Sequence, residues 1–312
     1  MDTRRLQAFV KIVDIGSLTR ASDILHVAQP ALSQQIIALE SQFGKKLLIR
    51  SKQGVVPTEA GRALYRHAQI ILRQLDQAQA DIRSSGNVVA GRVSVGLAPF
   101  STASVLALPL LQTVRARYPN ILLHINENFG GVISEMIMTG KLDVAFIYDP
   151  GPIRGVTFEP LLDENLFLVA PRSRIEFLSG KEEITVQQLA DLELMLPTNI
   201  HTVRKVVDTT FRRVGLVPKL IAEIESLPTM AKAISAGMGS TILPWSAANA
   251  TRDSDEDVAV LRITKPLMNV RISLCVSDQF PLSEPALAVN DILTELAHLF
   301  AASDDAQGVQ RV

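Results

Sequence analysis

Cysteine and long apolar runs are scarce in this sequence, and each shortage argues against a class of protein. The chain of 312 residues contains one cysteine, Cys275, so no disulfide can form within it. Because this thiol lies in the apolar stretch ISLCV, we expect a small buried side chain, with a redox sensor as the weaker alternative. No run of about 18 uncharged apolar residues occurs, so no transmembrane helix is expected. The opening residues, MDTRRLQAFVKIVD, are charged throughout, unlike a signal peptide, which predicts a cytoplasmic protein.

Motifs of catalysis and metal binding are also missing. We find no G-x-S-x-G, H-E-x-x-H, C-x-x-C or phosphate-binding loop, and GMGSTILP lacks the spacing of a dinucleotide fingerprint. Histidines without ligand spacing are His26, His67, His124, His201 and His298. A two-lobed transferase or decarboxylase with an added helical domain would need a converging acid–base or nucleophile set. None can be assembled, so we expect no enzyme, metal or cofactor.

The charge is small overall but unevenly distributed. The net charge of −1 combines residues 1–90, with 12 Lys and Arg against 7 Asp and Glu, and residues 91–312, with 19 against 25. A basic N-terminal segment on an acidic body favours a nucleic-acid module joined to a sensor, although chance unevenness is the alternative. It also argues against a solute-binding protein, as does the missing signal peptide. The length suggests two or three domains.

Residues 15–40, IGSLTRASDILHVAQPALSQQIIALE, have the pattern of a helix-turn-helix. Apolar residues at helical spacing predict a first helix from Thr3 to Asp14, and Ser17 is a good N-cap for the second. The third helix opens with Gln29-Pro30, and Gly44 supplies its C-terminal stop. Such a third helix buries one face and offers the other to base edges in the major groove.

The outward face of the third helix carries residues that can contact bases. Glutamine can make paired hydrogen bonds to adenine, serine can bond several base edges or a phosphate, and alanine can touch a thymine methyl. The alternative is that these are ordinary solvated helix residues. The candidate contacts here are Gln29, Pro30, Ala31, Ser33, Gln34 and Gln35.

The segment 45–58, KKLLIRSKQGVVPT, has the pattern of a β-wing, with two short apolar strands around a Lys52-Gln53-Gly54 turn. A wing of this kind presents cations to the DNA backbone or minor groove. We expect salt-sensitive phosphate contacts from Arg4, Arg5, Arg50 and Lys52.

A long helix is predicted from Glu59 to about Ser84, capped by Thr58. Its apolar residues follow the four–three spacing of a coiled-coil seam. A helix that packs on its own domain gives a similar stripe, but a dimer would let two short reading helices contact two half-sites. The seam consists of Leu64, Ala68, Ile71, Leu75, Ala78 and Ile82. Residues 84–91, SSGNVVAG, read as a hinge-like linker.

The remaining chain alternates strands with helices, which is the rhythm of a doubly wound α/β sheet. The predicted strands are 92–97, 121–127, 142–148, 166–170, 192–196, 219–224, 240–244 and 270–276. The predicted helices are 104–117, 132–139, 202–214, 228–236 and 284–301. The late return of an apolar strand suggests that the chain crosses to a second lobe and back, near Leu162 and Thr264.

Three loops follow predicted strands and are candidate ligand sites, namely 98–102, 128–131 and 196–202. Ligands in open α/β sheets lie beyond the carboxyl ends of the strands, where backbone N–H groups can bind an anion. The hydroxyls could equally be plain N-caps. The candidate effector residues are Ser101, Thr102, Asn128, Gly130, Thr198 and Thr202.

FVKIVDIGSLTRASDILHVAQPALSQQIIALESQFGKKLLIRSKQGVVPTEAG resembles the winged helix-turn-helix of LysR-type transcriptional regulators. The runs VDIGSL, AQPALSQQ and LLIR resemble the family's nitrogen assimilation control branch. Two residues depart from the general family pattern. Ala28 replaces a Ser or Thr cap worth about 1 kcal/mol, and Gln34 replaces a common basic residue. Both changes are shared with that branch, so we expect a shifted operator preference.

The resemblance implies a multidomain regulator with a winged helix-turn-helix at 1–58, a linker helix and hinge at 59–91, and an effector-binding domain at 92–312. The last is expected to be a two-lobed α/β domain of periplasmic-binding-protein type, with lobe 1 at about 92–162 and 265–302 and lobe 2 at about 163–264. The implied partners are double-stranded DNA, a homodimer or homotetramer, and RNA polymerase. A small organic anion is the family's common effector, whereas the nitrogen branch is thought to act without one.

Overall fold

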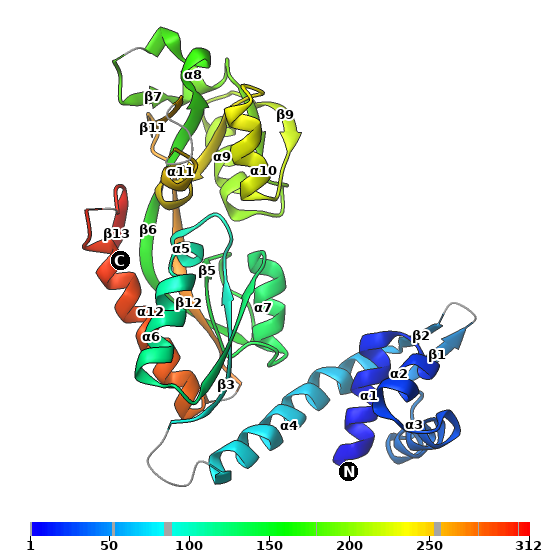
Figure 1. The fold of residues 1–312 in the computed structure, drawn as a ribbon. Helices are drawn as coiled ribbons and strands as arrows, with labels where there is room; N and C mark the ends of the chain where they lie inside the picture. Colours follow the sequence, from blue (N-terminus) through cyan, green and yellow to red (C-terminus); the bar gives the residue numbers. More distant parts are fainter. Residues whose placement is uncertain are drawn as a thin grey trace. The chain divides into compact units, whose positions relative to one another are not determined.

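The computed structural model describes residues 2–51, 54–83, 89–178, 180–252, 257–279, 281–304 and 306–312. The chain forms two compact units, one of Met1–Val88 with Thr139–Lys141 and the other of Val89–Met138 with Leu142–Val312. Both units are drawn in Figure 1.

The first unit begins with the three predicted helices, α1 (Thr3–Ile15), α2 (Leu18–Leu25) and α3 (Gln29–Phe43). Local capping fixes their ends. Ser17 accepts the backbone N–H of Arg20 at 3.4 Å, and Gly16 and Gly44 close α1 and α3 in the left-handed conformation. Ala28 makes no side-chain capping bond, so α3 starts without the cap that a serine would supply.

The predicted wing is confirmed as an antiparallel hairpin of β1 (Leu48–Ser51) and β2 (Gly54–Pro57), although its predicted turn residues Lys52 and Gln53 lie outside the described residues. The Val55 N–H donates to the Gly16 carbonyl at 2.8 Å, which holds the hairpin against the turn between α1 and α2. Residues from the helices and from the wing together form one core. Its members are Leu6, Ala8, Phe9, Ile12, Leu18, Ala21, Leu32, Ile36, Leu39, Leu47, Leu48, Val55 and Ala68.

The long helix α4 (Glu59–Arg83) completes the first unit. Thr58 caps it, since its Oγ1 accepts the Gly61 N–H at 3.0 Å while donating to the Lys46 carbonyl at 2.7 Å. The start of α4 is thereby tied to the segment that enters the wing. The helix also lies against α1, where the Tyr65 hydroxyl hydrogen-bonds the Asp14 carboxylate.

The second unit contains a long mixed sheet in the order β4-β3-β5-β12-β6-β11-β7, with β10 and β13 also paired to β6. The strands of this unit are β3 (Gly91–Leu97), β4 (Ile121–Glu127), β5 (Val144–Tyr148), β6 (Val156–Pro171), β7 (Glu183–Thr185), β8 (Glu193–Leu196), β9 (Lys219–Glu223), β10 (Thr241–Pro244), β11 (Val258–Thr264), β12 (Asn269–Ser277) and β13 (Val309–Arg311). Strands β8 and β9 form a separate parallel pair.

Helices pack around both ends of this sheet, and each end with its helices forms one lobe (Figure 1). We call β3–β5 with α5–α7 and α12 lobe 1, and β7–β11 with α8–α11 lobe 2. The helices are α5 (Thr102–Val105), α6 (Ala107–Arg117), α7 (Gly130–Met138), α8 (Val186–Leu189), α9 (Thr202–Arg213), α10 (Leu227–Ser235), α11 (Trp245–Arg252) and α12 (Glu284–Ala301). The two-lobed α/β architecture is as predicted.

Strand β6 is longer than predicted and runs through both lobes. The sequence predicts a strand only at 166–170, whereas β6 covers Val156–Pro171, pairing with β12 over its first half and with β10 and β11 over its second. Pro160 and the acidic residues near it argue against a strand in the sequence, so the first half of β6 was not predicted. A register shift opposite Ile272/Ser273 accommodates this region, as is usual for proline in a strand. Short elements at β7, β11, α11 and β13 were also not predicted.

The described helices give no candidate for a membrane crossing, because none is both long enough and apolar enough. Cys275 is fully buried on β12, as predicted for a small apolar side chain. Burial, together with the negative charge of Asp149, raises the pKa of its thiol to about 12, so the reactive thiolate is disfavoured.

Candidate functional site

Helix α3 presents the predicted polar face. Leu32, Ile36 and Leu39 are fully buried in the core, which directs the opposite side of the helix outward. Gln29, Pro30, Ala31 and Gln34 are exposed, and Ser33 and Gln35 are half-buried.

The wing and α3 are joined through two of the predicted contact residues. Arg50 on β1 is exposed, and its Nη1 donates to the Ser33 Oγ at 3.0 Å. This bond places a cation of the wing beside the polar face of α3. At the start of α1, Arg4 is exposed and Arg5 is half-buried. The wing and α3 therefore offer both hydrogen-bonding groups and positive charge side by side.

Glu40 is a structural residue of this module that sequence reasoning missed. It is buried at 8% exposure near the end of α3 and accepts the Leu47 N–H at 2.9 Å and the Leu48 N–H at 3.3 Å. Lys46 adds an ion pair at 2.8 Å. Burial alone would raise the pKa of Glu40, but Lys46 and the two N–H groups outweigh it and lower the pKa. Its position four residues after Ile36, on the buried stripe, was the available signal.

The predicted seam of α4 divides into two parts. Ala68 is fully buried in the core of its own unit and Leu64 packs against that core, so Ala68 is not available to a partner. The predicted dimerisation seam is therefore wrong for Ala68. In the first turns of α4 the alternative holds, in which the helix packs on its own domain. Farther along, Leu75 is half-buried and Ala78 is exposed, while Ile71 and Ile82 are 37% and 73% exposed.

In the second unit, the predicted effector residues in the loop before α5 are buried and hydrogen-bonded within the chain. Ser101 and Thr102 are buried at 1% and 0% exposure. Ser101 Oγ donates to the Ala98 carbonyl at 2.7 Å and accepts the Ala103 N–H at 3.0 Å, which is ordinary capping. The Thr102 N–H donates to Glu164 Oε1 at 3.1 Å. Sequence reasoning assigned no role to Glu164, which is fully buried on β6.

The other predicted effector residues belong to separate local structures. Asn128 Oδ1 accepts the N–H of its neighbour Phe129 at 2.9 Å, and the Thr198 hydroxyl donates to the Glu225 carboxylate. Gly130 begins α7 and Thr202 begins α9.

His201 lies where the two lobes meet and was also missed. It is 3% exposed and caps α9 by accepting the Val203 N–H at 3.2 Å. Its ring centroid lies 5.8 Å from that of Phe100, 5.5 Å from Phe129 and 5.9 Å from Tyr148, all in lobe 1 and in edge-on contact. Burial, with a smaller contribution from Lys205, lowers the pKa of His201 to about 4, so the ring is neutral at neutral pH.

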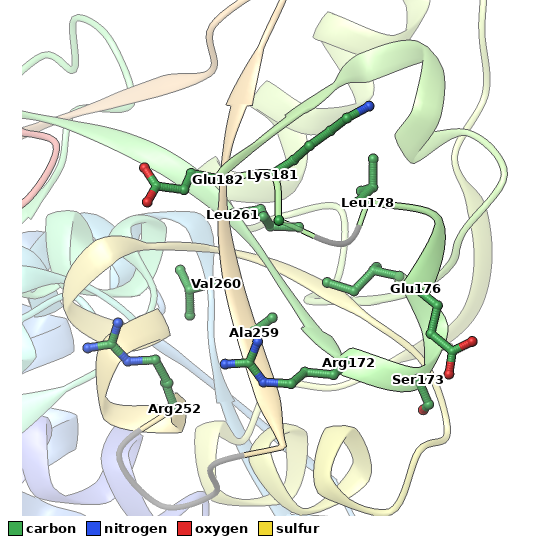
Figure 2. A pocket seen from close by; sticks show the side chains of 12 residues that line it. Arg172, Ser173, Glu176, Leu178, Lys181, Glu182, Arg252, Ala259, Val260 and Leu261 are labelled. Carbon is green, nitrogen blue, oxygen red and sulfur yellow. The ribbon is translucent and has the colours of Figure 1, made fainter.

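A pocket of about 520 Å³ lies elsewhere, on lobe 2. Figure 2 shows acidic and basic side chains around it, with Lys181 directed away from Arg172 and Arg252. None of the predicted effector residues lines it. Within the described ranges, no cluster of three or more His, Cys, Asp or Glu could hold a metal ion.

Comparisons with known proteins identify both units. The family model of the bacterial regulatory helix-turn-helix protein, lysR family, matches residues 3–62, and that of the LysR substrate binding domain matches 86–297. Nitrogen assimilation regulatory protein nac of Klebsiella aerogenes is 43% identical over 296 residues, 95% of each chain. The nac protein of Escherichia coli K12 is 44% identical over 293 residues, 94% of each chain.

Solved structures share the full-length fold. A full-length OxyR variant of Pseudomonas aeruginosa superposes with a TM-score of 0.74 at 24% identity, covering 99% of this chain and 98% of its own. Full-length CbnR complexed with its target DNA has a TM-score of 0.67 at 25% identity, covering 95% and 100%. With both family models matched and relatives above 40% identity along nearly the whole chain, the protein belongs to the LysR family of transcriptional regulators.

Proposed function

We propose that this regulator reads its operators with the exposed polar face of α3 while the wing contacts the DNA backbone. The observation that carries the proposal is the Arg50–Ser33 bond, which brings a wing cation beside the polar face of α3. Gln29, Ala31 and Gln34 then contact base edges, while Arg4, Arg5, Arg50 and Lys52 contact phosphates. A full-length protein of the same fold, CbnR, has been solved in complex with its target DNA, which supports DNA binding by this chain.

Substituting Gln29 by alanine tests the role of α3. We expect the variant to lose about 1–3 kcal/mol of preference for the operator over other sequences, because a paired base contact is removed. Arg50→Ala is the matched comparison. It should weaken binding to operator and random DNA alike and reduce the salt slope by about 1. Gel-shift titrations on both DNAs measure these effects, and equal losses on operator and random DNA for Gln29→Ala would contradict the assigned role.

We further propose that the distal part of α4 mediates dimerisation through Ile71, Leu75, Ala78 and Ile82. Ile71 and Ile82 are exposed in the single chain, and a partner helix would cover them. Two such subunits present two copies of α3 to the half-sites of a near-palindrome. Dimers can associate further into tetramers.

The double variant Ile71→Asp/Ile82→Asp should dissociate at concentrations where the wild-type chain is dimeric, because two charges would be buried in an apolar seam. Sedimentation velocity measures the change. Arg66→Glu, an exposed position off the seam, is the control and should leave the sedimentation coefficient unchanged. An unchanged dimer in the double variant would refute the seam.

As a transcriptional regulator, the protein is proposed to act in the cytoplasm, to contact RNA polymerase at its promoters, and to use no cofactor or catalytic group.

We also propose that a small molecule could control the protein by binding where the lobes meet. The Ser101–Thr102 loop would recognise its carboxylate, and Asn128, Gly130, Thr198 and Thr202 lie on the flanking elements. Thermal-shift screening with small organic anions tests this last proposal.

A further inference from the structure

The meeting point of the lobes already contains a carboxylate. Glu164 is fully buried on β6. Its Oε1 accepts the Thr102 N–H at 3.1 Å, and its Oε2 lies 3.3 Å from the Tyr148 hydroxyl, whose single proton is shared with the closer Phe100 carbonyl at 2.8 Å. Among the described residues we find no ion pair to Glu164, so hydrogen bonds hold it. Burial raises the pKa of Glu164 to about 7, and the hydrogen bonds from Thr102 and Tyr148, which favour the ionised form, limit this rise.

The backbone N–H group that binds Glu164 belongs to the loop that we predicted to bind an effector. The Thr102 N–H belongs to the loop whose hydroxyls and N–H groups predicted an anion site. Phe100 in the same loop has a left-handed backbone, with φ of 57°, and its carbonyl lies 2.8 Å from the Tyr148 hydroxyl. A left-handed backbone at a bulky residue is strained and persists only where surrounding contacts hold it. The loop is thus shaped around this cluster.

The lobes interlock around the cluster and leave its members covered. Phe100 of lobe 1 packs in the hydrophobic core of lobe 2 with Phe167 and Trp245, while His201 of lobe 2 packs against the rings of lobe 1. Phe100, Tyr148 and His201 are each at most 3% exposed. An external carboxylate could therefore reach the Thr102 N–H only by taking the place of Glu164.

We propose that Glu164 is an internal ligand of this site: the chain supplies the carboxylate that the Ser101–Thr102 loop recognises, and Glu164 thereby sets the specificity of the site against external organic anions. The inference rests on the proposed site of small-molecule control. It goes beyond that proposal, because it says that the Glu164 side chain occupies the site when no small molecule is bound. The same donors should bind a free carboxylate once the side chain of Glu164 is removed.

Acetate binding to Glu164→Ala tests the inference. The substitution leaves the Thr102 N–H without its acceptor and opens space of about the size of the lost side chain. We expect a lower Tm than wild type and a saturable rise of roughly 2–4 °C with sodium acetate over sodium chloride at equal ionic strength. Wild type should show no such rise. Glu159→Ala, which removes an exposed carboxylate from the same strand, should behave as wild type.

Glu164→Gln separates lost charge from lost volume. The amide keeps the shape and an acceptor for Thr102, so this variant should fold without an acetate response. If Glu164→Ala is insoluble, refolding from urea should recover more protein in acetate than in chloride. No acetate effect on Glu164→Ala in either assay, or an equal effect on wild type, would overturn the inference. Gel shifts of the same samples test operator reading separately from the role of Glu164, because operator binding by the wild-type chain does not depend on the acetate result.

Discussion

Gly61→Ala should disrupt the DNA-binding module, although alanine is ordinarily the better residue in a helix. A Cβ atom at Gly61 would lie 2.0 Å from the Leu47 carbonyl oxygen and 3.1 Å from Pro57 Cβ. Alanine gains roughly 0.5–1 kcal/mol from helix propensity. Overpacking against backbone costs about 3 kcal/mol or more when nothing can move aside. The clash therefore prevails, and we expect a large loss of stability in the first unit together with loss of DNA binding.

Gly131→Ala is the matched control, since Gly131 also lies in a helix near its start and an added Cβ would meet nothing within 4 Å. We expect a neutral or slightly stabilising effect there. Urea unfolding monitored by circular dichroism, with gel shifts alongside, measures both variants. Similar behaviour of the two would show that the contact between Gly61 and Leu47 does not constrain the start of α4.

Glu40→Ala should give the second large effect, by detaching the wing from α3. The variant leaves the Leu47 and Leu48 N–H groups without their acceptor, at about 1–3 kcal/mol for each buried donor left unsatisfied. The exposed Lys46 ion pair adds little. We expect lower stability and weaker binding to all DNA sequences, since the wing is displaced while the bases of the operator are still read.

The lowered pKa of Glu40 also predicts a pH dependence. The ionised carboxylate stabilises the folded module above the pKa of the unfolded chain, and this stabilisation is lost as the pH falls through the lower, folded-state value. The gap in unfolding free energy between wild type and Glu40→Ala should thus narrow in acid. Asp23→Ala, at an exposed position on α2, is the control and should show a small gap. A Glu40 gap that stays constant from neutral pH into acid would contradict this role of the charge.

The DNA-binding module could be predicted closely because its signals are local. Helix periodicity, Ser17, the glycines at 16 and 44, and the short apolar strands of the wing are each signals within a few residues, and the described elements follow them. The lobes were also predicted, since apolar strands alternate with helices. The exposed face of α3 followed from the buried stripe of Leu32, Ile36 and Leu39.

What the sequence could not predict depends on contacts between distant segments. Glu164 and His201 look like ordinary polar residues in the sequence, and Glu40 differs only by its place on the buried stripe of α3. The fold alone brings Glu40 to Leu47, Glu164 to Thr102 and His201 to the aromatic rings. The same holds for Ala68, whose spacing fits a coiled-coil seam but which packs on its own core. The first half of β6 was missed because pairing on both sides stabilises a stretch whose proline and charges argue against a strand.

The most direct test of the account is selection of DNA by the full-length protein from a random duplex pool at about 150 mM salt, followed by titration of the recovered sequence against a scrambled duplex. We predict enrichment of a near-palindrome with two half-sites, bound roughly 10³-fold or more tightly than the scrambled control. A pool without enrichment, or equal affinity for the two duplexes, would contradict the claim that α3 reads sequence while the wing contacts the DNA backbone.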